Sequence, residues 1–97
     1  MATFNVNNAH HGSLTASVVD TVIFPATGSA HEFLITNTAA SDIYCRFDGG
    51  TPGIAADDSY IVPGNGQLSY FVSQQPIEFT NIKFIGGNNG NYHCQRI

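Results

Sequence analysis

The strongest constraint on the fold of this sequence is a series of short apolar segments separated by clusters of turn-forming residues. The clearest case lies in residues 33–50, where two apolar segments, 33–36 and 43–47, flank a polar turn. Side chains in the second segment alternate between apolar and more polar types, which is typical of a β-strand with one buried face. Two such segments joined by a short polar loop predict a β-hairpin.

Other parts of the chain repeat this pattern. Residues 14–24 form the longest strand-like run, and its apolar phase changes around Asp20, which predicts two strands with a bend or bulge there. Before this run, residues 8–12 are polar and are expected to form a turn. Two further hairpins are predicted around turns rich in Gly and Asn, one from residues 59–62 with 67–73 and one from residues 82–87 with 91–97.

Together these segments predict about seven to nine short strands at a spacing of about 8–12 residues, the pattern of a sandwich or barrel. The sequence contains no amphipathic helix pattern of useful length. A chain of 97 residues forms a single domain, 1–97, and residues 1–12 are expected to be an N-terminal arm or edge strand. We therefore predict an all-β fold, an antiparallel β-sandwich, of which the jelly roll is one form.

Charge and hydropathy exclude several classes of protein. Seven acidic against three basic residues argue against a nucleic-acid-binding protein and against adhesion to anionic membranes. No apolar run approaches the roughly 20 residues that span a bilayer. The polar start of the chain predicts no signal peptide and therefore synthesis in the cytoplasm, unless a leader has been removed.

Only 10% of the residues are charged, compared with about 25% in typical soluble domains. Two explanations remain open. Much of the surface is buried against other subunits, or the surface is polar but uncharged, as in many extracellular β-proteins.

Three residue pairs are candidates for metal ligands or a cross-link. Cys45 and Cys94 lie in alternating segments and are first interpreted as small buried apolar residues, with a disulfide as the second interpretation. They lack the CxxC spacing of a metal site. The adjacent histidines at 10 and 11 would point to opposite faces of a strand, and we expect them in an exposed loop. Asp57 and Asp58 lack the alternating ligands of a calcium loop.

The sequence contains no recognisable catalytic motif. It has no GxSxG or HExxH motif, and the Gly-rich residues 86–90 lack the Lys and Ser/Thr of a phosphate-binding loop. We therefore predict no enzymatic activity, no catalytic residue, no cofactor and no metal site.

Carbohydrate binding is a separate hypothesis, because small β-sandwiches bind sugars by stacking aromatic rings on them. The absence of Trp weakens it, and core or interface packing is the competing interpretation of these aromatic residues: Tyr44, Tyr60, Tyr70 and Phe71.

Three segments, residues 35–38, 43–47 and 61–66, together carry a resemblance to a known class of protein. The order of an apolar strand ending in Asn-Thr, a gap, an apolar-Tyr-x-Arg-aromatic strand and an apolar-Pro-Gly turn resembles small virion proteins of tailed phages. The resemblance covers residues 33–97. It implies a capsid decoration (cement) protein that is made in the host cytoplasm, lies on the capsid surface, and binds the major capsid protein and copies of itself as a homotrimer. Residues 2–11 would then be the arm that contacts the capsid.

We expect the interface of such a protein to use exposed aromatic residues and one of its few basic residues. Arg46 would serve either as an interface anchor or as a partner of Asp48 or Asp58. Two alternatives stay open: a carbohydrate- or receptor-binding module of a virion fibre or secreted protein, and a head–tail connector or tail subunit. The candidate interface residues are Phe4, Tyr44, Arg46, Tyr60, Tyr70 and Phe71.

Overall fold

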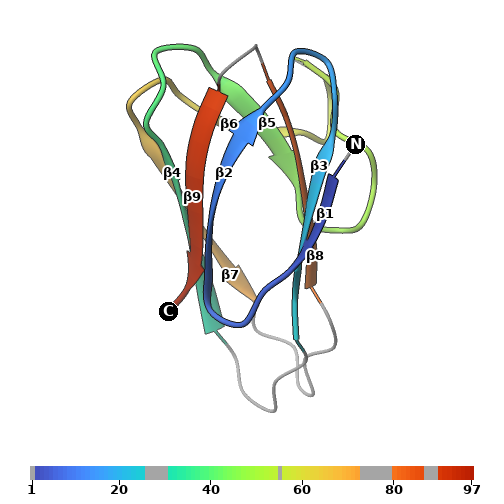
Figure 1. Cartoon of the computed structure of the whole chain (residues 1–97), viewed down its shortest axis with the longest axis vertical. Helices are drawn as coiled ribbons and strands as arrows, with labels where there is room; N and C mark the ends of the chain where they lie inside the picture. The colour runs from blue at the N-terminus through green and yellow to red at the C-terminus, as the bar shows by residue number, and fades with distance from the viewer. Residues whose placement is uncertain (1, 26–30, 55, 73–79, 87–89) are drawn as a thin grey trace.

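The computed structural model describes residues 2–25, 31–54, 56–72, 80–86 and 90–97. Within these residues the chain forms nine strands and no helix, and the strands make two sheets that face each other (Figure 1). No helix in this described part could therefore cross a membrane. The strands are β1 (Ala2–Asn5), β2 (Ala9–Leu14), β3 (Asp20–Phe24), β4 (His31–Asn37), β5 (Ile43–Arg46), β6 (Tyr60–Val62), β7 (Gln67–Val72), β8 (Thr80–Gly86) and β9 (Gly90–Arg96).

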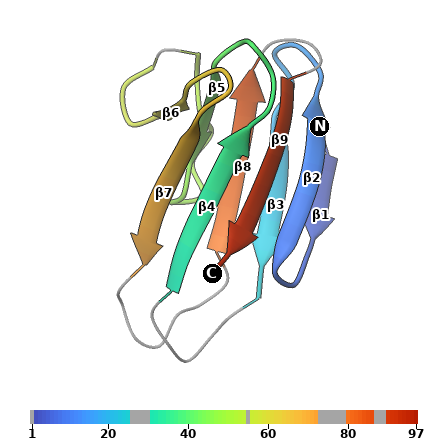
Figure 2. The ribbon, with the colours of Figure 1, turned by 90° about the vertical axis from the view of Figure 1, so that its left-hand side faces the viewer.

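The strand order confirms the predicted antiparallel β-sandwich. Sheet A has the order β1-β3-β8-β5-β6 and sheet B the order β2-β9-β4-β7. Every described strand pair is antiparallel except β1 with β3, which is parallel. Strands β2 to β9 follow the order of a jelly roll, in which Greek-key connections are folded into two packed sheets. Figure 2 shows sheet B in front, with β7 and β2 as its two edges.

The three predicted hairpins are wrong in one specific respect. In each case the two strands exist, but the first lies in one sheet and the second in the other: β4 and β5, β6 and β7, and β8 and β9. Alternation shows which side chains face the core, but both sheets of a sandwich present the same alternation, so it does not identify the partner strand. Among the described strands, only β5 and β6 are both consecutive and hydrogen-bonded to each other. Residues 87–89 of the last predicted turn lie outside the described residues.

A buried amide side chain holds the crossing from sheet B to sheet A after β4. Asn37 is 1% exposed, and its Nδ2 donates to the carbonyl oxygens of Ser41 at 2.7 Å and Val62 at 3.1 Å. Its Oδ1 accepts the backbone N–H of Ala39 at 2.9 Å. One side chain therefore fixes both the crossing loop and the end of β6.

The connection between β6 and β7 packs against the same crossing loop. The N–H of Asn65 donates to the carbonyl of Ala39 at 2.8 Å, and the N–H of Gly64 donates to Oδ1 of Asp42 at 3.0 Å. A Cβ added to Gly64 would lie 2.0 Å from the carbonyl oxygen of Ala40, so this approach requires glycine. The two loops thus form one unit at this end of the sandwich.

The N-terminal third of the chain differs from the prediction in its boundaries. Residues 9–14 form β2, not a polar turn, and the run 14–24 is interrupted by a turn at residues 15–19, where Ser17 has φ of 62°. Sequence periodicity misses β2 because this edge strand contains His, Gly and Ser in place of an apolar stripe. Gly12 has a packing role, because a Cβ there would lie 2.3 Å from Cζ of Tyr92.

The core lies between the sheets and contains the inward-facing residues of both. Both cysteines are buried, free thiols, as first interpreted, and burial raises the pKa of each to about 12. One buried polar contact crosses the core, from the hydroxyl of Tyr92 to Oδ2 of Asp20 at 3.2 Å. The buried apolar residues are Leu14, Val22, Phe24, Phe33, Ile35, Ile43, Cys45, Val62, Ile82, Phe84, Tyr92 and Cys94.

Candidate ligand-binding cleft

An open cleft of about 510 Å³ lies where the edge strands β6 and β7 of the two sheets meet the end of β5. Its walls combine aromatic rings with charged and hydroxyl groups. The lining residues are Arg46, Phe47, Asp48, Asp58, Ser59, Tyr60 and Tyr70.

Three aromatic rings form one wall of the cleft. Tyr60 pairs with buried Cys45, and Tyr70 pairs with buried Phe33, so both tyrosines occupy inward positions of their edge strands. The rings of Phe47 and Tyr70 stack with centroids 3.9 Å apart and planes 3° apart. Tyr60 meets both rings edge-on, at 5.6 Å and 5.5 Å, and remains 45% exposed. The rings support one another, and Tyr60 offers surface to a ligand.

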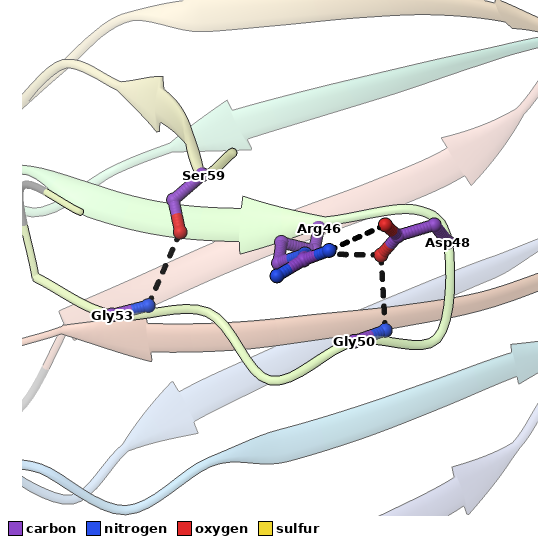
Figure 3. A network of polar contacts seen from close by, with 5 residues as sticks. All are labelled: Arg46, Asp48, Gly50, Gly53 and Ser59. Atoms are coloured by element: carbon purple, nitrogen blue, oxygen red, sulfur yellow. Dashed lines mark hydrogen bonds and ion pairs between the residues drawn. The ribbon is translucent and has the colours of Figure 1, made fainter. Parts of the chain in front are cut away.

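An ion pair forms the polar part of the cleft (Figure 3). Nε and Nη2 of Arg46 donate to the two carboxylate oxygens of Asp48 at 3.0 Å and 2.5 Å. The backbone N–H of Gly50 donates to the same carboxylate at 2.9 Å. The bond from Arg46, followed by that from Gly50, lowers the pKa of Asp48 to about 2. The carboxylate is therefore ionised and oriented at any physiological pH.

The loop between β5 and β6 positions these groups. Gly49 has φ of 82°, a conformation that favours glycine, and turns the chain directly after Asp48. A Cβ on Gly50 would lie 2.6 Å from Cζ of Arg46, so the loop backbone runs close against the guanidinium. The far end of the loop is held by Ser59, whose Oγ accepts the N–H of Gly53 at 3.1 Å (Figure 3). The loop is thus anchored at both ends by side-chain contacts.

The six predicted interface residues are divided among different surfaces. Arg46, Tyr60 and Tyr70 line the cleft. Tyr44 lies on the outer face of sheet A, where it pairs with Ile61 and Ile85 of the neighbouring strands. The outer face of sheet B carries Phe71, which is 63% exposed. Phe4 lies at the opposite edge of the sandwich, where its ring is tilted by 32° against that of His10 with centroids 4.3 Å apart.

Sequence reasoning identified one contact of the cleft and missed several of its members. The expected pairing of Arg46 with Asp48 is confirmed. Phe47, which follows the last residue of β5, gave no signal as a cleft residue; it packs partly buried against the core and also lines the cleft. Ser59 gave no signal as a ligand-binding residue, and Asp58 was named only as a partner of Arg46 and, beside Asp57, in relation to a calcium loop. Their position depends on the path of a loop whose sequence contains mainly turn-forming residues.

The adjacent pairs His10 with His11 and Asp57 with Asp58 belong to no larger cluster of possible metal ligands in the described part of the chain. Within the described ranges, no group of three His, Cys, Asp or Glu side chains could hold a metal ion. Asp58 has φ of 67° at the turn before β6 and faces the cleft, and Asp57 is exposed beside it. None of the described residues that line the cleft is a histidine or a cysteine.

No protein-family model matches this sequence, and no curated protein sequence matches it. Several solved structures share its fold. PirA is 12% identical, with a TM-score of 0.62 over 95% of each chain. PliG of Aeromonas hydrophila, a periplasmic inhibitor of g-type lysozyme, is 12% identical, with a TM-score of 0.54 over 98% of this chain and 97% of its own. The pre-peptidase C-terminal domain of a Bacillus anthracis collagenase is 13% identical, with a TM-score of 0.53 over 98% and 94%. This chain is thus a β-sandwich module similar in fold to these proteins.

Proposed function

We propose that this protein is a non-catalytic binding module that takes a neutral carbohydrate in the cleft beside β6 and β7. The observation that carries the proposal is the meeting of three aromatic rings, two carboxylates and one guanidinium around a single open cleft. Its volume of about 510 Å³ falls within the range of about 300–1,000 Å³ of small-molecule sites. A sugar has apolar C–H faces and hydroxyl edges, so its binding site needs both aromatic rings and polar groups.

The charges of the cleft favour a neutral ligand. Arg46 already donates two N–H groups to Asp48, so its positive charge is neutralised there. Asp58 adds a second carboxylate to the lining and makes the cleft net negative. An acidic sugar would be repelled, whereas the hydroxyls of a neutral sugar can donate to the carboxylate oxygens.

The cleft is also ordered before a ligand arrives. The Asp48 carboxylate is held by three hydrogen bonds, two from Arg46 and one from Gly50. The Phe47 ring is held against Tyr70. A site that is ordered in the free protein loses less conformational entropy on binding.

A glycan array followed by titration calorimetry tests the proposal. We expect binding of one or more neutral oligosaccharides, with affinity reduced by about tenfold or more in Tyr60→Ala, a loss of about 1.4 kcal/mol or more. Phe71→Ala is the matched control, because it removes a more exposed aromatic ring from the outer face of sheet B. Equal losses in both variants, or no binding by the wild type, would contradict the carbohydrate function.

A second candidate is the virion structural protein implied by the sequence resemblance. None of the three similar structures is named as a phage protein, so this candidate rests on that resemblance and on the surface. Jelly rolls are used in viral capsids, and apolar side chains are exposed at Ile54, Ile61 and Phe71, with 56%, 46% and 63% of their surface accessible. Such side chains on a weakly charged surface suit contacts with other subunits.

Light scattering after size-exclusion chromatography distinguishes the two candidates. A decoration protein is expected to form a trimer and to co-sediment with expanded empty capsids through the major capsid protein. A connector or tail subunit would form a ring of higher order. A monomer that does not bind capsids would contradict both virion roles and leave the binding module.

A further inference from the structure

Two histidines that are far apart in the sequence meet on the outer face of sheet B. His11 on β2 and His93 on β9 are directly opposite in the antiparallel register. Their rings stack with centroids 4.1 Å apart and planes 16° apart. Figure 2 shows β2 and β9 side by side at the edge of the sheet opposite β7, so this pair is separate from the cleft.

The surroundings of the pair are polar and uncharged. His93 pairs on its other side with Thr36 of β4, which pairs in turn with Gln67 of β7. Nε2 of Gln67 donates to Oγ1 of Thr36 at 3.3 Å and does not bond to either imidazole. Among the described residues, neither ring takes part in a side-chain hydrogen bond, and His11 is exposed to solvent. The ring nitrogens are therefore available to a ligand from solution.

The protonation state suits the same purpose. Burial lowers the pKa of His93, and the nearby His11 lowers it further. Two imidazolium rings this close would repel each other, so the doubly protonated pair is unfavourable. The neutral imidazole, with a free lone pair, is the form that binds metals.

We propose that His11 and His93 together bind one divalent transition-metal ion, each through one ring nitrogen, with water in the remaining coordination positions. A metal–nitrogen distance of about 2.0–2.1 Å places the two nitrogens of such a pair about 3 Å apart. Directly opposite residues of an antiparallel pair have Cβ atoms about 4.5–5.5 Å apart, so both imidazoles can reach one ion once they turn out of the stack by rotation about χ1 and χ2.

The chemistry of imidazole selects the class of metal. Imidazole suits zinc, copper and nickel, whereas calcium and magnesium prefer oxygen ligands. Among the divalent ions copper should bind most tightly, because stability rises from nickel to copper and falls at zinc. The bound ion would connect the edge strand β2 to β9 through side chains, in addition to the backbone pairing of the two strands. This inference is independent of the carbohydrate function, since no residue is shared with the cleft.

Copper(II) titration of the tag-free chain, followed by electron paramagnetic resonance at about pH 7.5 where imidazoles are mostly neutral, tests the site. We expect one tightly bound copper per chain, with a spectrum of two equatorial nitrogen donors. His11→Ala and His93→Ala should each weaken binding by about tenfold or more and leave one-nitrogen spectra.

His31→Ala is the matched control, because His31 lies at the other end of β4 from Thr36 and should not affect copper binding. Zinc should also raise the melting temperature of the wild type and of His31→Ala, but not of His11→Ala. Wild-type affinity in His11→Ala or His93→Ala, or a loss of binding in His31→Ala, would overturn the proposal.

Discussion

The buried amide of Asn37 gives the most demanding test of how this fold is held together. Replacing Asn37 with Ala removes three hydrogen bonds, two donated to the carbonyls of Ser41 and Val62 and one accepted from Ala39. At about 1 kcal/mol net for each, the free energy of unfolding should fall by about 3 kcal/mol. Because a domain of this size is stable by about 5–15 kcal/mol, this is a large part of the total.

Urea unfolding followed by circular dichroism measures the loss. With a slope of about 1.5 kcal/mol per molar urea, the midpoint should fall by about 2 M. Thr38→Ala is the control, because the adjacent Thr38 is exposed and its hydroxyl makes one long contact of 3.4 Å. It should cost less than about 0.5 kcal/mol.

A second substitution separates hydrogen bonding from shape. Asn37→Asp keeps the volume and can still accept from Ala39, but a carboxylate cannot donate to the carbonyls of Ser41 and Val62. Repulsion and burial should raise the pKa of the new carboxyl group in the folded state. The destabilisation should therefore shrink as pH falls through that raised pKa, because the folded state then binds the proton more tightly. A loss below about 1 kcal/mol in Asn37→Ala, or a pH-independent loss in Asn37→Asp, would refute the reasoning.

Three further predictions concern the core and the charged part of the cleft. Gly12→Val should destabilise the fold by about 1–3 kcal/mol in thermal unfolding, because even a Cβ would lie 2.3 Å from the buried, hydrogen-bonded Tyr92; wild-type stability would contradict this contact. Cys45 and Cys94 should resist a thiol reagent in the native state and react fully in denaturant, since burial raises both pKa values to about 12; fast native labelling would place them at the surface. The carboxyl carbon of Asp48 should titrate near pH 2 by NMR. Since its folded pKa lies below the ordinary 3.8, its contribution to stability is present above about pH 4 and is lost as pH falls through 2, whereas a midpoint at 3.8 would show that the ion pair does not persist in solution.

The sequence predicted the strands far better than their pairing. In β5 and β9 the sequence pattern correctly predicted that Cys45 and Cys94 are buried, because alternation reflects the burial of each side chain and not the identity of the neighbouring strand. Pairing depends on residues that show no periodic pattern. The crossing after β4 is fixed by the amide of Asn37, which resembles any polar turn residue in a sequence.

The cleft was predicted in part for a similar reason. Tyr60 and Tyr70 were named from their aromatic character, and the contact of Arg46 with Asp48 follows from sequence neighbours. Asp58 was named as a partner for Arg46 and, with Asp57, as a pair that lacks the pattern of a calcium loop, and its place in the lining depends on the path of residues 47–59. The pair formed by His11 and His93 arises from the register of β2 with β9, a contact between the two ends of the chain that no local pattern reveals.

The most direct test of the central claim is an NMR titration of the labelled protein with a neutral oligosaccharide that binds on the array. Saturable shifts are predicted for the amides of residues 46–48 and 58–60 and for Tyr70, with no change at His11 or Phe71 on the outer face of sheet B. Tyr60→Ala should abolish these shifts and retain the folded spectrum. Shifts centred on the outer face of either sheet, or shifts that persist in Tyr60→Ala, would contradict the assignment of the cleft as the binding site.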